Sequence, residues 1–335
     1  STLVSMFPDE IDKVVLDGVQ NPHEYYNAYA DFEEWTQSDQ VLAGIFDSCV
    51  ENSDKCSLSR HGKTGHELLN KVKKLVENLR SNPIPMDNII VDDNVVHLQL
   101  AGSLYATQYW PNLTIALDSL LSGNVNGTFL RQYLGADVKI DASSLAMETK
   151  LPQALSGIHC LDRRARTSSW ADFAPAVQKL SQTSWTMGGA SVALSMTCAQ
   201  WSLEPKERYE GDFQVKPRNP VLLVGNRFDG HTPIRSARNV SSGFTGSEVL
   251  EVNGYGHISL VLPSACTIQK VSQYWMDGIL PKKGTVCNVD APPFSNISWN
   301  DVIAKSRALD LTKRDIESIP PIPAVLPWMS RWRSM

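Results

Sequence analysis

The chain has 335 residues, of which 42% are hydrophobic and 20% charged, which suits one large α/β domain with an inserted cap. Its formal net charge of −5 excludes the basic surface with which proteins bind nucleic acids or anionic membranes, so we expect neither partner. No apolar run approaches the length of a membrane span.

The first strong pattern along the chain is a short apolar run, Val14–Val19, which predicts a strand and contains the pair Asp17-Gly18. A long, mostly helical insertion is predicted to follow it, as far as about residue 215. Apolar residues recur at helical spacing in Asn21–Cys49, Gly65–Leu79, Val95–Tyr109 and Leu113–Leu121. The prolines of Ser81-Asn-Pro-Ile-Pro85 are expected to end the second helical segment, and Trp110-Pro111 to separate the last two.

Two later apolar runs, Val221–Val224 and Val249–Val252, predict buried strands of a parallel sheet, because each is β-rich and ends at a turn signal. The segment between them, Pro233–Phe244, has the apolar spacing of a helix. The sequence therefore predicts a strand–helix–strand unit. Asp229 follows the first of its strands and His257 follows the second.

Open α/β sheets place their active sites at the C-terminal ends of their strands, where Asp229 and His257 are expected. A carboxylate beside an imidazole fixes the imidazole tautomer and stabilises its cation, and the imidazole moves a proton to and from a nucleophile. The two residues are therefore candidates for catalysis. His231, two residues after Asp229, is expected at the rim of the site and not as a second base.

Four segments carry a family pattern: Gly225-Asn-Arg-Phe-Asp-Gly-His-Thr-Pro233, Gly254-Tyr-Gly-His-Ile258, Pro263-Ser-Ala-Cys266 and Asp277-Gly-Ile-Leu-Pro-Lys-Lys-Gly-Thr-Val-Cys287. In them the chain resembles the C-terminal part of α/β-hydrolases, most closely the tripeptidyl-aminopeptidase-like group related to prolyl aminopeptidases. Members usually have Asp-Pro-Val-Thr-Pro where this chain has Asp229-Gly-His-Thr-Pro233, a departure that keeps the acid. The resemblance extends to about Phe294 and implies that Asp229 is the acid and His257 the base of a catalytic triad.

The resemblance also implies a fold class: the C-terminal part of a doubly wound α/β-hydrolase sheet with a large, mostly helical cap insertion. Residues 1–20 then correspond to the helix and strand that follow the nucleophile, and residues 21–215 to the cap and return segment. Residues 216–294 are the strand–helix–strand unit with the acid and the histidine. Residues 295–335 contain a helix, Trp299–Leu311, and a proline-rich tail that includes Ile319–Trp328.

The nucleophile of such enzymes is the Ser of a Gly-x-Ser-x-Gly turn, which precedes the acid and the histidine in the chain. None of the 335 residues forms this motif, so we expect the Ser to lie upstream of residue 1 and the chain alone to be inactive. Ser191, in Gly189-Ala-Ser-Val-Ala193, lies too close to Asp229 and in a segment typical of a helix. Ser103 also lies within a helical pattern.

Six cysteines and four Asn-x-Ser/Thr sequons, at Asn112, Asn126, Asn239 and Asn296, indicate an oxidising, secretory history. A signal peptide is expected upstream of this chain. The cysteine positions suggest the local pairs Cys49–Cys56, Cys160–Cys198 and Cys266–Cys287, although sequence alone leaves other pairings open. The cysteines and histidines show no zinc spacing, so neither a metal nor another cofactor is expected.

The segment Gly157-Ile-His-Cys-Leu-Asp162 is similar to a motif that follows the cap in the resembling family and approaches its active site. His159 is expected to be a packed or loop histidine and not a catalytic one. Asp162 has two interpretations, contact with a substrate amine or a helix N-cap.

Taken together, the chain is predicted to be part of a secreted serine hydrolase that acts on a small peptide or ester, with a peptidase releasing short N-terminal peptides or amino acids as the first choice. The alternatives are a non-catalytic α/β-hydrolase-like binding or scaffold protein, and an esterase or another amide hydrolase. The oligomeric state is left open.

Overall fold

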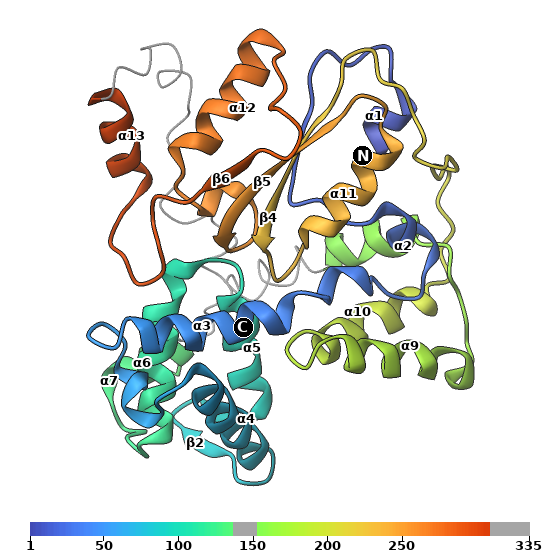
Figure 1. The fold of residues 1–335 in the computed structure, drawn as a ribbon. Helices are drawn as coiled ribbons and strands as arrows, with labels where there is room; N and C mark the ends of the chain where they lie inside the picture. The colour runs from blue at the N-terminus through green and yellow to red at the C-terminus, as the bar shows by residue number, and fades with distance from the viewer. Residues whose placement is uncertain (137–152, 309–335) are drawn as a thin grey trace. The chain divides into compact units, whose positions relative to one another are not determined.

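The computed structural model describes residues 1–136 and 153–308 of the chain. These residues form two compact units, and the sheet that contains β4, β5 and β6, labelled in Figure 1, belongs to the first. Unit 1 comprises Ser1–Asp39 and Asp141–Asp290, and unit 2 comprises Gln40–Ile140 and Ala291–Met335. The division of the sequence at residues 20, 215 and 294 stays a prediction.

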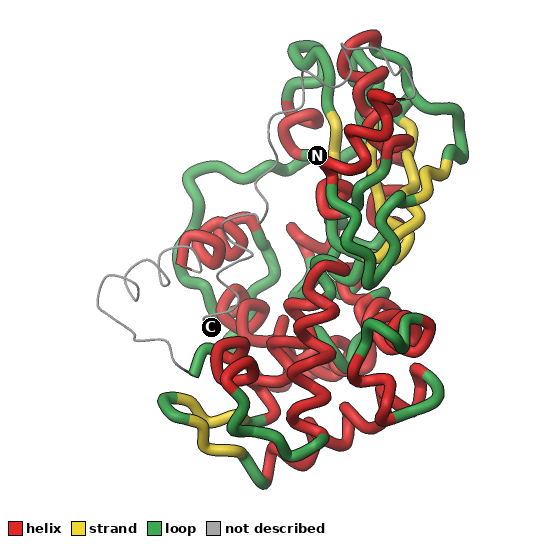
Figure 2. The backbone as a smooth tube through the Cα atoms, turned by 90° about the vertical axis from the view of Figure 1, so that its left-hand side faces the viewer, coloured by secondary structure: helices red, strands yellow, loops and turns green. Residues whose placement is uncertain are grey.

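Unit 1 is built on a four-stranded parallel sheet in the order β1-β4-β5-β6. Figure 2 draws the strands of the protein in yellow. Its strands are β1 (Val15–Asp17), β4 (Leu222–Phe228), β5 (Glu248–Tyr255) and β6 (Val286–Asn288). The three predicted strands are confirmed, and so is the α/β fold class. Strand β6 was not predicted, because three residues with exposed ends carry no alternation that a sequence pattern could reveal.

Both faces of the sheet are buried, and the alternation along β4 explains how. Val221 and Leu223 point into one apolar cluster with the helix α11 (Ile234–Gly243). Leu222 and Val224 point into a second cluster, which includes Tyr274 of α12 (Ala265–Asp277). Side chains alternate across a strand, so a continuous apolar run fits a strand that is covered on both sides.

The other elements of unit 1 are helices, of which α11 and α12 pack against the sheet. They are α1 (Thr2–Met6), α2 (Pro22–Asn27), α9 (Trp170–Thr183), α10 (Gly188–Ala199), α11 and α12, with short 3-10 turns at Glu33–Trp35 and Ser259–Val261; residues 153–162 are also helical. Helix α11 confirms the helix predicted between the two central strands. The helix α3 (Ser38–Glu51) begins in unit 1 and continues into unit 2.

Unit 2 is mostly helical. Its further elements are η2 (Ser57–His61), α4 (Gly65–Ser81), α5 (Asp93–Ser103), η3 (Thr107–Tyr109), α6 (Trp110–Leu121), α7 (Thr128–Leu134), α13 (Trp299–Ala308) and a two-stranded antiparallel hairpin, β2 (Ile84–Met86) with β3 (Ile89–Val91). The hairpin was not predicted. The helix expected over Val95–Tyr109 is shorter than predicted, and a 3-10 turn replaces its end.

Trp110-Pro111 does not separate two helices as expected but begins α6. A proline is tolerated in the first turn, because the backbone N–H that it lacks has no partner within the helix there. Helix α13 covers Trp299–Ala308 of the helix predicted over Trp299–Leu311. The last three residues of that prediction and the proline-rich tail lie outside the described residues.

All three expected disulfides are present: Cys49–Cys56, Cys160–Cys198 and Cys266–Cys287. The last joins α12 to the edge strand β6. Across residues 1–136 and 153–308, no helix has the length and apolar character needed to cross a lipid bilayer.

Candidate active site at the strand ends

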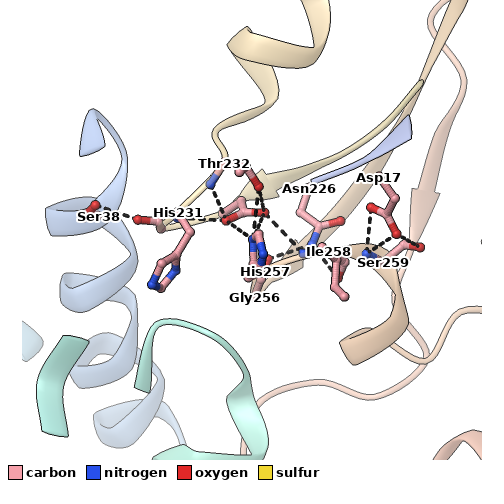
Figure 3. Close-up of polar contacts among 11 residues, drawn as sticks. Asp17, Ser38, Asn226, His231, Thr232, Gly256, His257, Ile258 and Ser259 are labelled. Carbon is pink, nitrogen blue, oxygen red and sulfur yellow. Dashed lines mark hydrogen bonds and ion pairs between the residues drawn. The ribbon is translucent and has the colours of Figure 1, made fainter. Parts of the chain in front are cut away.

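Asp229 and His257 lie just beyond the ends of two neighbouring parallel strands. β4 ends at Phe228, and β5 ends at Tyr255; these two residues are paired in the sheet, and their rings stack with centroids 4.4 Å apart. The turn after each strand therefore starts at the same level of the sheet. As a result, the two side chains meet, and the Nδ1 atom of His257 lies 3.3 and 3.4 Å from the carboxylate oxygens of Asp229 (Figure 3).

The carboxylate of Asp229 is almost fully buried, with 1% of the residue exposed, and the turn that follows supplies its hydrogen-bond donors. The backbone N–H groups of His231 and Thr232 donate to Oδ1 at 2.8 and 2.9 Å. The hydroxyl of Thr232 donates to Oδ2 at 2.9 Å, and the N–H of Ile258 donates to it at 3.3 Å. A buried carboxylate needs such donors to stay ionised.

His257 has its Nδ1 atom directed at acceptors. The nearest is Oγ1 of Thr232, at 3.0 Å, whose own O–H donates a hydrogen bond to Asp229. The carboxylate of Asp229 lies next to it. This environment favours the tautomer with the proton on Nδ1, which places the basic lone pair on Nε2. A histidine held in this state can accept a proton from a nucleophile and return it to a leaving group.

The pKa values of the pair move in the directions that an ion pair requires. Burial alone would raise the pKa of Asp229, but the charge of His257 and the hydrogen bonds from His257 and Thr232 outweigh it and lower the pKa. Burial alone would lower the pKa of His257, but Asp229, with a further contribution from Asp17, outweighs it and raises the pKa. Each partner thus stabilises the charged form of the other.

His231 lies beside the pair and not at a rim as expected: only 4% of the residue is exposed. Its ring lies 5.4 Å from the ring of His257 and 6.0 Å from the ring of Trp35, measured between centroids. Burial, with the charge of His257, lowers the pKa of His231 to about 3. His231 therefore stays neutral beside a histidine that can be charged.

The end of strand β1 also reaches this site. Asp17 accepts hydrogen bonds from the backbone N–H of Ser259 at 3.0 Å and from its hydroxyl at 2.8 Å. Gly18 has a φ of +71°, and a Cβ atom there would lie 3.2 Å from Cε1 of His257. The strand end is thus packed against the imidazole, and only a glycine fits both the conformation and the space.

Asn226, on strand β4, holds the other side of the loop that carries the histidine. Its side-chain amide donates to the carbonyl of Gly256 at 2.7 Å and to that of Ile258 at 2.9 Å. The two carbonyls flank His257. We call residues 256–259 the histidine loop.

The serines weighed as nucleophiles both lie in helices. Ser191 is in α10, where its hydroxyl donates to the carbonyl of Gly188. Ser103 is the last residue of α5 in unit 2, and its hydroxyl donates to the carbonyl of Gln99. Neither sits on the strand-to-helix turn that presents a nucleophile in α/β-hydrolases.

His159 is a packed histidine in a second buried cluster of charges in unit 1. It lies 2.7 Å from the fully buried guanidinium of Arg163, which donates to Asp31 at 2.6 Å. Burial alone would raise the pKa of Asp31, but hydrogen bonds and charge from His159 and Arg163 lower it. Asp162 accepts a hydrogen bond from Tyr25 at the end of the helix formed by residues 153–162, so it is not an N-cap.

In the described part of the chain, no group of three or more His, Cys, Asp or Glu side chains is placed to hold a metal ion. Sequence reasoning gave no role to four residues that shape the site: Asp17, Asn226, Thr232 and Ser259. A signal existed for two of them. Asp17 is a carboxylate at the end of a predicted strand, and Thr232 lies three residues after Asp229, a spacing at which a hydroxyl can bond the acid.

Comparison with known proteins covers the same region. Residues 185–287 match a family model described as TAP-like protein, of the type Abhydrolase_4. The matched range includes β4, α11, β5 and α12, with both Asp229 and His257. No curated protein matches the chain.

Proposed function

Because residues 185–287 are a TAP-like region of the α/β-hydrolase superfamily, we propose that this protein is the part of a secreted serine hydrolase that bears the triad acid and base. In this proposal Asp229 orients His257 and stabilises its cation. His257 removes the proton from a serine as that serine attacks a carbonyl, and then returns the proton to the leaving group.

The observation that carries the proposal is the contact between Asp229 and Nδ1 of His257 at the ends of adjacent parallel strands. Three features of this contact suit catalysis: the acid is buried, its remaining lone pairs accept hydrogen bonds, and the histidine has a raised pKa. Titratable groups with shifted pKa values, paired at a strand end, are typical of active sites.

The serine of this proposal belongs to a segment outside these 335 residues, because none of them forms a Gly-x-Ser-x-Gly turn. β1 is an edge strand of the sheet in the described part of the chain, so one of its two sides has no strand partner there. We place the strand that precedes the serine at this side. A serine at the carboxyl end of that strand would lie at the same edge of the sheet as Asp17 and His257.

The substrate class follows from the family likeness and is the least specific part of the proposal. A short peptide with a free N-terminus, cleaved at an amide, is the first choice, and an ester or another amide is the second. The three disulfides fit a protein that folds in an oxidising compartment, which supports secretion.

The proposal is tested by sequencing the transcript that encodes residues 1–335 and expressing the longest reading frame. We expect it to encode Gly-x-Ser-x-Gly ahead of residue 1, and the product to hydrolyse peptidyl p-nitroanilides or p-nitrophenyl esters. His257→Gln should abolish turnover, and Asp229→Asn should lower kcat by about four orders of magnitude. His66→Gln, at an exposed position in unit 2, is the matched control and should leave turnover unchanged.

Turnover that survives His257→Gln would overturn the proposal. So would labelling of Ser191 by a fluorophosphonate probe, since it would place the nucleophile in α10. A second candidate function, a non-catalytic protein that binds ligands through the same fold, is favoured by the absence of the nucleophile motif. A reading frame in which a signal peptide runs directly into Ser1 would support that candidate.

A further inference from the structure

The histidine loop has a backbone conformation that needs support. Ile258 has a backbone φ of +62°, which residues other than glycine rarely adopt, and Gly256 has a φ of +145°. His257 lies between them, so its position depends on how firmly its neighbours are held. A non-glycine residue in this region persists only where surrounding contacts determine it.

Three side chains from two strand ends make those contacts. Asn226 binds the carbonyls on either side of His257, and Asp229 accepts from the N–H of Ile258. Asp17 completes the set from the neighbouring strand β1, where both of its oxygens accept from the N–H of Ser259. Figure 3 shows Asp17 and Ser259 on one side of Ile258, and His257 and Thr232 on the other.

Asp17 differs from Asn226 because it also carries a charge. Burial raises its pKa, and the neighbouring charge of Asp229 adds to this effect, while the two hydrogen bonds from Ser259 lower it. Its charge interacts favourably with that of His257. The site therefore holds two carboxylates at the ends of the adjacent strands β1 and β4, half-buried Asp17 and buried Asp229, that act on a single imidazole.

The end of strand β1 also packs closely against the histidine loop and the imidazole ring of His257. A Cβ atom at Gly18 would lie 2.6 Å from Cγ2 of Ile258 and 3.2 Å from Cε1 of His257. The residue after Asp17 is therefore in close contact with the loop that Asp17 binds. Gly18 thus packs against the ring of His257, while Asp17 binds the loop that carries it.

We propose that Asp17 is a positioning residue for His257, which fixes the histidine loop through Ser259 and whose charge acts on the imidazole. The inference rests on the proposed function for its catalytic meaning. The physical claim concerns the imidazole alone, so turnover is not needed to test it.

The experiment is an NMR titration of the 335-residue chain with ¹³C- and ¹⁵N-labelled histidine, following the imidazole of His257. The variants are Asp17→Asn and, as the matched control, Asp39→Asn. Asp39 is also a carboxylate of unit 1 that binds backbone N–H groups and hydroxyls, but its partners are Ser184, Trp185 and Thr186.

In Asp17→Asn we expect the titration midpoint of His257 to move to lower pH, because a stabilising negative charge is lost. The Ser259 amide should exchange its hydrogen about tenfold faster or more, because a charge-assisted hydrogen bond is weakened. Asp39→Asn should change neither quantity. An unchanged His257 midpoint in folded Asp17→Asn protein would overturn the proposal, because a merely structural aspartate would not affect that midpoint.

A second measurement keeps the inference testable if Asp17→Asn does not fold. In the unmodified chain, the His257 resonance should show a second, smaller step at the pH where the Asp17 carboxyl titrates. Ser259→Ala keeps the charge of Asp17 but removes the hydroxyl that lowers the pKa of Asp17, so this step should move to higher pH. Absence of the step, or a step that Ser259→Ala leaves in place, would overturn the proposal.

The two proposals can fail separately. If the longer reading frame encodes no nucleophile but the Asp17 titration behaves as described, the proposed hydrolase function fails and the positioning of His257 remains. If turnover depends on His257 but Asp17→Asn leaves its titration unchanged, only the role of Asp17 is lost.

Discussion

The hydroxyl of Thr232 lies 3.0 Å from Nδ1 of His257 and also donates a hydrogen bond to Asp229. It therefore links the two residues of the candidate pair through a single oxygen atom. Because Thr232 is buried, no solvent replaces the hydroxyl when it is removed. The pair then loses one donor at the carboxylate and one acceptor at the imidazole.

From this geometry we predict that Thr232→Val lowers the free energy of unfolding by about 1–3 kcal/mol, the usual cost of leaving buried polar groups without a partner. Thr232→Ser keeps the hydroxyl and loses only a methyl group, so it should cost clearly less. Urea unfolding of both variants at neutral pH provides the measurement. Equal losses in the two variants would show that packing of the methyl group, and not the hydroxyl link, accounts for the effect.

A second prediction concerns His231 and acid stability. The pKa of His231 is lowered to about 3 in the folded protein, whereas the pKa of a histidine in the unfolded chain is about 6.5. Between these values the unfolded chain binds a proton that the folded chain does not. The free energy of unfolding should therefore fall as the pH drops from about 6.5 toward 3, by about 1.4 kcal/mol per pH unit from this residue.

Urea unfolding at pH 6 and at pH 4 tests this, with the unmodified chain compared to His231→Asn. The variant removes the titration, so it should lose about 2 kcal/mol less than the unmodified chain over this range. His66→Gln, at an exposed position, should keep the original slope. If the His231→Asn curve is as steep as the original, acid sensitivity comes from other groups.

The four sequons differ in whether a glycan fits the folded chain. The amide of Asn239 donates to the carboxylate of Glu33 at 2.8 and 2.9 Å, and Glu33 is itself buried. Asn126 and Asn296 are exposed, as Asn239 is, but they lie outside helices and strands. Asn112 lies in the first turn of α6, and its sequon threonine, Thr114, is fully buried.

We therefore predict glycans at Asn126 and Asn296, and none at Asn239 or Asn112, when the chain is expressed through a eukaryotic secretory pathway. Enzymatic deglycosylation in H₂¹⁸O followed by peptide mass spectrometry identifies the occupied sites. Asn126→Gln should remove one glycan mass from the intact protein. A glycan found at Asn239 would contradict the prediction, because the glycosidic bond replaces one of the two Nδ2 hydrogens that face Glu33.

The fourth prediction ranks the disulfides by the loops that they close, which span 38, 21 and 7 residues in sequence separation. A longer loop removes more entropy from the unfolded chain. Replacing both cysteines by alanine should cost about 4 kcal/mol for Cys160–Cys198, about 3 for Cys266–Cys287 and about 2.5 for Cys49–Cys56. Urea unfolding of the three double variants checks the order, and a reversed order would indicate native-state effects stronger than loop entropy.

Much of the fold could be predicted because its signals are local. A run such as Val221–Val224 identifies a strand buried on both faces, and the turn signal after it places Asp229 at the strand end. The same reasoning placed His257, and the short spacings of the cysteines favoured the pairings that the structure contains. Short or irregular elements carried no such signal, and the three-residue strand β6 and the hairpin β2–β3 were missed for that reason.

The contacts within the site depended on tertiary structure. Asp17 and Ser259 are separated by 242 positions in the chain, and they meet only because β1 and β5 both pair with β4 in a particular register. The burial of His231 follows in the same way from rings that other segments bring to it. Which residues stand at the strand ends could be derived from the amino-acid sequence, because alternation and turn chemistry act over a few positions. Which of those side chains touch depends on the folded sheet, because strand order and register are set by packing across the whole sheet.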